Sequence, residues 1–316
     1  MVEKELFMSE LISVVITTYS RPISLRRAIE SVIRQTYDNI EVIIVDDNSD
    51  AKIREQVKEI VYSFCDNRLR LICNDHNMGG ALSRNQGIKA SNGRYISFLD
   101  DDDEYLPHRI ERQYDLFQKS SDEKLALVYS YCREERKSKE IKEYRNDYVG
   151  NCVYESMIDC IAATSQWMCR KDYLYNVGMF SDVPCKQDST VIVKLMAAGY
   201  SIDRVPEVLS IYHTDEVVRI SSNNHKKRIE GEERLRQLCR DNYNLIKKDE
   251  IALVEYSFAC RLAEHYLALK QYRKFADSMK NILRKPLKKD SLRVYKHLIV
   301  VTKENLFGAK EFRGKI

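Results

Sequence analysis

The sequence predicts an α/β fold in which a mainly parallel, mixed sheet is flanked by helices. Runs of β-branched residues, typical of buried strands, alternate with segments whose apolar residues recur at helical spacing. Polar clusters directly follow three of the strand-like runs, and in such sheets ligands bind beyond the carboxyl ends of the strands. These two observations predict both the fold class and the edge of the sheet that carries a functional site.

The strand and helix patterns alternate through the first half of the chain. The expected strands at 12–18 and 40–45 are nearly continuous apolar runs, as in strands that are buried on both faces. Strands are expected at residues 12–18, 40–45, 69–73, 95–99 and 125–131, and later at 208–212. Helical spacing is found in segments that begin near Pro22, Ile53, Gly80 and Pro107, and a later helix begins at Asp188. Between these two regions, residues 132–165 are less regular, and we expect an excursion from the fold there.

The chain of 316 residues is long enough for one large domain with an appendage. Its charge is unevenly divided, because residues 224–316 hold 23 Lys and Arg against 12 Asp and Glu, whereas residues 1–223 hold 29 against 36. The pattern after residue 223 is also almost wholly helical. We therefore expect a first domain at 1–223 and a basic α-helical extension at 224–316.

Composition excludes several classes of protein. No apolar run approaches the roughly 18–20 residues of a membrane-spanning helix, and the first ten residues, MVEKELFMSE, lack the apolar centre of a signal peptide. The nine cysteines include no CxxC pair and no zinc-like spacing. We expect reduced cysteines and a cytoplasmic location.

The acidic run Asp100-Asp101-Asp102-Asp103 directly follows the apolar strand at 95–99. Four consecutive carboxylates repel one another, so a folded loop of this kind favours a cation. Mg²⁺ and Mn²⁺ prefer oxygen ligands and commonly lie between carboxylates and substrate phosphates. A solvated acidic turn is the alternative, but the position after a buried strand favours a site that binds a metal and a diphosphate.

Three further positions have both a functional and a structural explanation. Asp47, after the strand at 40–45, could accept hydrogen bonds from a base or ribose, or could belong to an Asx turn that caps the next helix. Asp188 could be a general base held by a rigid helix, or an N-cap. His213 follows the late strand and could be a metal ligand, or a structural histidine.

Seven segments, taken in order and at this spacing, resemble inverting family 2 glycosyltransferases of the GT-A type. The resemblance covers roughly residues 12–221. The segments are SVVITTYSRP (13–22), EVIIVDDNSD (41–50), NMGGALSRNQGI (77–88), GRYISFLDDDDEYLP (93–107), VGMF (177–180), QD (187–188) and VPEVLSIY (205–212).

The resemblance implies a role for each matching residue. On the donor side, it implies that the uracil and ribose of a UDP-sugar are held by Thr17, Tyr19 and Asp47, with Arg21 nearby, Arg84 facing the donor, and Asp100 and Asp101 making ribose and secondary contacts. Asp102 would be the main ligand of Mn²⁺ or Mg²⁺, and His213 matches a late histidine that ligates the metal in some GT-A enzymes. Asp188 matches the catalytic base, although here Gln187 precedes it where many relatives have an acidic pair.

The activity implied by the resemblance is a single displacement. A hexose or N-acetylhexosamine would move from the UDP-sugar to a hydroxyl of a glycan or lipid-linked acceptor, in the synthesis of a bacterial surface polysaccharide. One catalytic carboxylate is enough, because the diphosphate is a good leaving group, whereas a glycosidase needs a second one.

Residues 284–289 carry four basic side chains near aromatic and aliphatic residues. One hypothesis is a surface that meets anionic lipid at the inner face of the membrane, with about 1 kcal/mol per basic residue. A solvated helical face or a homodimer contact explains the charge equally well. Nucleic acid is not expected as a partner, because no recognised binding motif accompanies the charge.

The sequence argues against three other functions. A sugar-nucleotide pyrophosphorylase needs a Gly-rich loop after the first strand, and the segment TTYSRP has none. A haloacid-dehalogenase-like phosphatase usually has its Asp pair after the first strand and a Thr or Val where this chain has Glu104. A degenerate scaffold that acts through its helical tail is a third possibility, but the intact Asp47, Asp102 and Asp188 argue against it.

Overall fold

The computed structural model describes residues 9–137, 139–214 and 224–283. Contacts within the chain divide it into two compact units. The first comprises Met1–Cys152, Cys160–Asp182 and Gln187–Val218, and the second comprises Val153–Asp159, Val183–Lys186 and Arg219–Ile316. The second unit therefore also includes two short segments from before residue 223.

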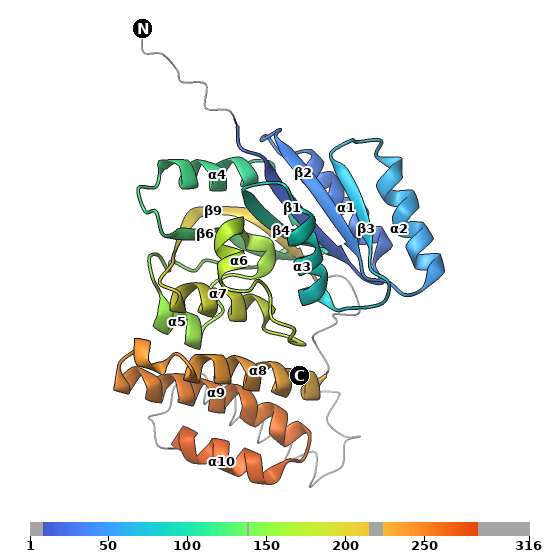
Figure 1. Ribbon diagram of the computed structural model, residues 1–316. Helices are drawn as coiled ribbons and strands as arrows, with labels where there is room; N and C mark the ends of the chain where they lie inside the picture. Colours follow the sequence, from blue (N-terminus) through green and yellow to red (C-terminus); the bar gives the residue numbers. More distant parts are fainter. Residues whose placement is uncertain (1–8, 138, 215–223, 284–316) are drawn as a thin grey trace. The chain divides into compact units, whose positions relative to one another are not determined.

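The first unit is built on a mixed sheet with the strand order β3-β2-β1-β4-β8-β6-β9-β5, and β7 pairs with β6. Figure 1 labels β1, β2, β3, β4, β6 and β9 of this sheet. The strands are β1 (Ile12–Thr18), β2 (Ile40–Asp46), β3 (Leu69–Cys73), β4 (Tyr95–Asp100), β5 (Asp103–Tyr105), β6 (Leu125–Arg136), β7 (Lys139–Tyr144), β8 (Trp167–Arg170) and β9 (Ser201–His213). Strands β3, β2, β1 and β4 are parallel, as are β6 and β9. β8 is antiparallel to β4 and β6, and β5 is antiparallel to β9. The expected mixed α/β sheet is confirmed.

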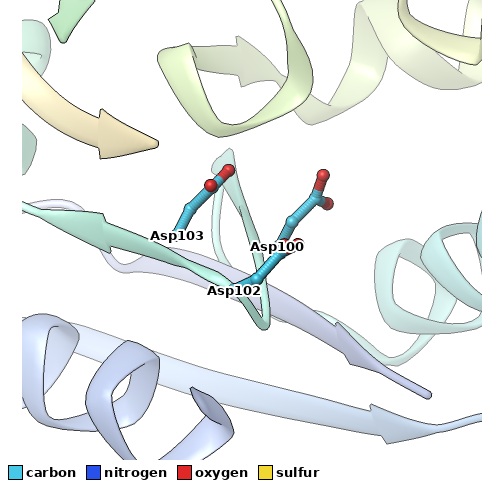
Figure 2. A group of neighbouring side chains, drawn as sticks. All are labelled: Asp100, Asp102 and Asp103. Carbon is cyan, nitrogen blue, oxygen red and sulfur yellow. The ribbon is translucent and has the colours of Figure 1, made fainter. Parts of the chain in front are cut away.

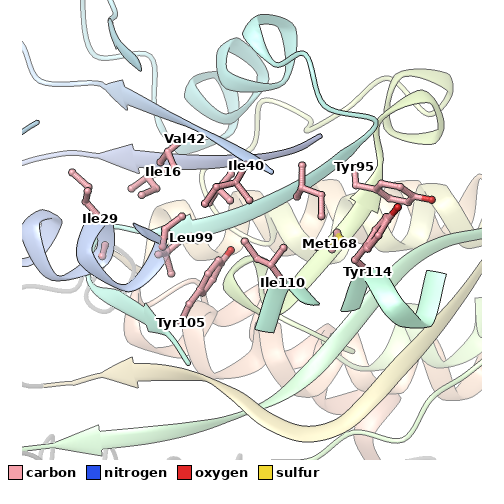
Figure 3. Packing of buried hydrophobic residues seen from close by; sticks show 14 of the residues in the cluster. Ile16, Ile29, Ile40, Val42, Tyr95, Leu99, Tyr105, Ile110, Tyr114 and Met168 are labelled. Carbon is pink, nitrogen blue, oxygen red and sulfur yellow. The ribbon is translucent and has the colours of Figure 1, made fainter. Parts of the chain in front are cut away.

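Helices connect the parallel strands as the helical spacing predicted. The α-helices of the first unit are α1 (Pro22–Ile33), α2 (Ala51–Ser63), α3 (Gly80–Ala90), α4 (Arg109–Lys119), α6 (Lys171–Asn176) and α7 (Gln187–Ala197). Ile29 of α1 packs with Ile16 of β1, Val42 of β2 and Leu99 of β4 in one buried hydrophobic cluster (Figure 3). The run of β-branched residues in β1 is buried almost throughout, because helices or loops cover both faces of this central strand.

The register of the parallel strands aligns the ends that carry the polar clusters. Thr17 of β1 lies opposite Val45 of β2 on one side and Asp100 of β4 on the other. The β1–α1 loop, the segment after β2 and the acidic run after β4 therefore start from the same edge of the sheet. This alignment brings the sequence-predicted clusters together.

The segment 132–165 is more regular than expected. β6 continues to Arg136 and forms an antiparallel hairpin with β7, and the one-turn 3₁₀ helix η1 (Thr164–Gln166) precedes β8. No pattern in the sequence indicates β7, because its residues, KEIKEY, are largely exposed at the edge and show almost no apolar alternation.

Every secondary-structure element that the structure describes in the second unit is a helix. The unit contains α5 (Val153–Ile158), α8 (His225–Arg240), η2 (Tyr243–Leu245), α9 (Lys248–Ala268) and α10 (Tyr272–Leu283). Tyr256, Ala259 and Ala263 of α9 pack with Ile282 of α10. The basic run at 284–289 lies outside the described residues. Among the helices described, none combines the length and the apolar character needed to cross a membrane.

Candidate active site

The acidic run forms the turn between β4 and β5. Asp100 ends β4 and Asp103 begins β5, so the chain reverses over Asp101 and Asp102. One carboxylate oxygen from each of Asp100, Asp102 and Asp103 lies within 4.8 Å of the other two (Figure 2). A set made only of carboxylate oxygens suits a hard divalent cation such as Mg²⁺ or Mn²⁺. The residues present therefore fit the metal that the sequence predicted.

Asp103 also belongs to this group, although the motifs in the sequence imply no ligand role for it. Its side chain is buried, and burial together with the charges of Asp102 and Asp100 raises the pKa of its carboxyl well above the usual range. The Ser165 hydroxyl donates to Asp103 Oδ2 at 2.6 Å and accepts from the backbone N–H of Asp100 at 3.1 Å. Ser165, in η1, thus connects both ends of the acidic turn.

Asp101 faces the β1–α1 loop instead of the three-carboxylate group. Its carboxylate accepts from the backbone N–H of Tyr19 at 3.1 Å and from the Arg21 guanidinium at 3.2 Å. Burial, and then the charge of Asp102, raise the pKa of Asp101 to about 7, although Arg21 opposes this shift. Arg21 also pairs with Asp102. The structure therefore brings Tyr19 and Arg21 to the acidic turn, as the sequence predicted.

Asp47 shapes the loop that leads into α3. Its two carboxylate oxygens accept from the backbone N–H groups of Met78 at 2.7 Å and Gly79 at 2.8 Å, and from Asn74 Nδ2 at 2.8 Å. The Asp47 side chain is buried, whereas Tyr19 is 40% exposed. Asp47 lies at the expected edge of the sheet, where these three hydrogen bonds hold the loop that precedes α3. Its predicted contact with the nucleotide stays a prediction.

Asp188 is the second residue of α7 and lies inside the first turn of that helix. Its Oδ1 accepts from the backbone N–H of Ser189 at 2.7 Å, and its Oδ2 lies 3.5 Å from the Cys160 sulfur. The preceding residue, Gln187, accepts from Arg84 Nη1 at 2.6 Å, and Arg84 also pairs with Asp100. Arg84 therefore connects the start of α7 with the acidic turn.

His213 is next to the acidic turn but outside the three-carboxylate group. Because β5 and β9 are antiparallel, the end of β9 lies beside Glu104, and His213 Nε2 is 3.0 Å from Glu104 Oε2. The hydrogen bond from His213 contributes most to lowering the pKa of Glu104. The structure gives His213 a carboxylate partner, and its predicted role as a metal ligand stays a prediction.

Several contacts of this site had no clear signal in the sequence. Ser165 lies in the segment that was expected to be irregular, and Cys160 is a lone cysteine without a motif. The contact between Gln187 and Arg84 joins residues that are 103 positions apart. Only the run of four aspartates could have indicated Asp103, but β5 is three residues long and too short for a periodic pattern.

Comparison with known proteins agrees with the fold and identifies the family. A family model described as "Glycosyl transferase family 2" matches residues 13–178, which is just over half of the chain. The Escherichia coli protein named UDP-Glc:alpha-D-GlcNAc-diphosphoundecaprenol beta-1,3-glucosyltransferase WfgD is 34% identical over 111 residues, or 35% of this chain and 42% of that protein. The putative colanic acid biosynthesis glycosyl transferase WcaA of Escherichia coli K12 is 45% identical over 100 residues, or 32% and 35%. The chain thus spans less than half of the length of these two relatives.

Solved structures share the fold at low sequence identity. Staphylococcus aureus TarS 1-349 in complex with UDP-GlcNAc is 13% identical, with a TM-score of 0.57 over 86% of this chain and 91% of that chain. The mannosyltransferase PcManGT from Pyrobaculum calidifontis, in complex with GDP-Man and Mn2+, is 17% identical, with a TM-score of 0.57 over 95% and 88%. The fold, the ordered motifs and the family match lead to one conclusion: this chain belongs to glycosyl transferase family 2.

Proposed function

We propose that this glycosyltransferase is metal-dependent and inverting, and that it moves a hexose or N-acetylhexosamine from a UDP-sugar to a hydroxyl of a glycan or lipid-linked acceptor. One observation carries the proposal. Three carboxylates meet at the end of β4, and Arg84 connects them with the start of the helix that bears Asp188. A metal–diphosphate site and a general base would then share one edge of the sheet.

The donor would bind along the edge formed by β1, β4 and α3. Tyr19 is exposed enough to stack on a base, and Thr17 lies beside Asp100 in the sheet. Arg21 and Arg84 bring positive charge to the acidic turn and would face the diphosphate. Asp102, with Asp100 and Asp103, would hold a divalent cation, which when bound stabilises negative charge on the departing diphosphate.

Asp188 would act as the general base. The acceptor hydroxyl would give its proton to the Asp188 carboxylate as its oxygen bonds to the anomeric carbon. The bond from that carbon to the diphosphate oxygen would break at the same time, and its electron pair would leave with the nucleoside diphosphate. Attack from the face opposite the leaving group inverts the anomeric configuration.

The names of the similar proteins support the proposed substrate class. WfgD is named for transfer from UDP-Glc to a GlcNAc-diphosphoundecaprenol, and WcaA for colanic acid biosynthesis. The TarS complex contains UDP-GlcNAc, and the PcManGT complex contains GDP-Man and Mn2+. A role in bacterial surface polysaccharide synthesis, with a lipid-linked acceptor, fits these names. GDP-mannose is the donor to test beside the UDP-sugars.

The basic extension at 224–316 is proposed to bring a catalytic domain at 1–223 to anionic lipid at the inner face of the membrane. Flotation with liposomes that contain or lack anionic lipid tests this part alone. Failure to float at low salt would favour a solvated face, and a concentration-dependent increase in mass would favour a homodimer.

The activity is tested by nucleoside diphosphate release from a panel of UDP-sugars and GDP-mannose, with Mn²⁺ or Mg²⁺. Asp188→Asn should lose transfer by about 10³-fold or more, because the acceptor proton then has no base, while donor binding persists. Asp249, also in the first turn of a helix, gives the matched control Asp249→Asn. Full activity of Asp188→Asn would remove Asp188 from the mechanism, and a wild-type protein inactive with every donor would favour a scaffold.

A further inference from the structure

Arg84 is the residue that joins two separate parts of the candidate site. Its side chain is 10% exposed, and its two terminal nitrogens reach different elements. Nη1 donates to Gln187 Oε1 at 2.6 Å, at the first residue of α7, and Nη2 pairs with Asp100 at the end of β4. A planar guanidinium fixes the direction of both bonds at once, so the position of one partner restricts the other.

The surroundings hold the Arg84 side chain in place. The guanidinium carbon lies 5.5 Å from the centre of the Phe180 ring, within the range of a cation–π contact. Asn85, the next residue of α3, holds the backbone of Phe180 from both sides, donating to its carbonyl at 2.9 Å and accepting from its N–H at 3.0 Å. Arg84 therefore lies against a ring that its own helix positions.

Gly80 leaves space for the contact between Arg84 and Gln187. A Cβ atom at Gly80 would lie 3.2 Å from Arg84 Nη1, closer than most Cβ contacts in proteins, and 3.4 Å from Gln187 Oε1. The first residue of α3 thus approaches the hydrogen-bonded pair closely, and a larger residue there would displace it.

We propose that Gln187 is a positioning residue for the glycosyl transfer: its bond to Arg84 fixes the first turn of α7, and so the direction of the Asp188 carboxylate, relative to the acidic turn. The inference rests on the proposed function, because it takes Asp188 as the base. Gln187 is adjacent to Asp188 in the chain, and its partner Arg84 binds the carboxylate of Asp100 directly. The neutral amide supplies an acceptor without placing a second negative charge next to Asp188.

Three substitutions of Gln187 separate the hydrogen bond from the volume of the side chain. Gln187→Met keeps length and volume but has no good acceptor, and Gln187→Asn keeps the amide but is one methylene shorter. Both should lower kcat about 10-fold while the Kd of the donor, measured by calorimetry, changes less than about 2-fold. Gln187→Glu keeps both the length of the side chain and an acceptor oxygen, so this variant should retain most of the wild-type kcat. Gln118→Glu, on the exposed face of α4, controls for the added charge.

A double-mutant cycle with Arg84→Met tests whether Gln187 acts through Arg84. Arg84→Met alone should lower kcat, and adding Gln187→Met should then lower kcat no further. A purely structural role of Gln187 in folding α7 would instead give additive losses and a lower Tm. Wild-type kcat in Gln187→Met, with Asp188→Asn inactive, would overturn this inference and leave the proposed function standing. Full activity of Asp188→Asn would contradict the proposed function itself.

Discussion

Single side chains of the site differ in how far the sequence could predict them. Asp102, Asp188 and Arg84 were assigned through ordered motifs. The structure places Asp102 and Arg84 at the same edge of the sheet as Tyr19, and Arg84 bonds to Gln187, the residue before Asp188. Their partners were not predictable, because a hydrogen bond such as that from Ser165 to Asp103 joins residues 62 positions apart. Local patterns carry no information on which distant side chain satisfies a buried carboxylate.

The histidine pair of the second unit, His225 and His265, should make the stability of the fold depend on pH. His225 Nδ1 lies 3.1 Å from His265 Nδ1, and desolvation is the largest cause that lowers the pKa of His265 to about 4. Glu264 and Glu232 oppose the shift, whereas His225 and Arg228 add to it. The His265 imidazole takes up a proton near pH 6.5 in the unfolded chain, but only near pH 4 in the folded chain. The folded state therefore loses stability as the pH falls from about 6.5 to about 4.

We expect the free energy of unfolding to fall by about 1–2 kcal/mol between pH 7 and pH 5 because of His265. Urea unfolding at the two pH values measures this change, and His265→Gln should remove most of it. An equal loss of stability in wild type and His265→Gln would assign the effect to other groups.

At the scale of elements, the periodic segments were predictable and the short ones were not. β1 and β3 have the expected bounds, although only β1 is a buried apolar run and β3 is partly exposed. β5 and β8, of three and four residues, were missed because their pairing depends on distant strands, β9 for the first and β4 and β6 for the second. Yet β5 matters for the site, because Asp103 is its first residue and the strand fixes the position of Asp103 next to Asp100 and Asp102.

The packing of α3 on β1 depends on Gly87. A Cβ atom there would lie 2.3 Å from Val15 Cγ1, in a strand buried on both faces, so Gly87→Ala must displace the helix or the strand. We expect a loss of about 1–3 kcal/mol of stability despite the better helix propensity of Ala. Chemical unfolding measures it, with Gly80→Ala as the control, since the atoms near Gly80 are the flexible ends of two side chains. Equal stability of the two variants would contradict this account of the packing.

For the whole molecule, the charge and the helical pattern of the sequence predicted that a second domain begins near residue 223. The structure shows that the second unit also includes residues 153–159 and 183–186. α5 packs in the second unit, where Ser257 and Arg261 of α9 donate to the carbonyl of Ile158 at 3.4 and 3.2 Å. Glu232 of α8 likewise pairs with Lys186 and with Arg261. The sequence could not predict this return, because the segments 153–159 and 183–186 are too short to carry a pattern of their own.

A chain that ends at residue 223 should therefore be less stable than the full chain. It keeps α5 and Lys186 but removes the helices α8 and α9 that contact them, so apolar and polar groups lose their partners. We expect a lower Tm and stronger binding of a hydrophobic dye, measured against the full chain. A truncated chain with the Tm of the full chain would show that the second unit contributes nothing to the stability of the first.

The most direct test of the central claim, a metal-dependent nucleotide-sugar site at the acidic turn, is calorimetric titration of the most active UDP-sugar into the full chain with Mn²⁺ and with EDTA. We predict at least about 10-fold tighter binding with Mn²⁺ in the wild type, because carboxylates and diphosphate share the cation. Asp102→Asn should lose that difference, and Asp249→Asn should keep it. Equal affinity with Mn²⁺ and with EDTA, or an unchanged response in Asp102→Asn, would contradict the account.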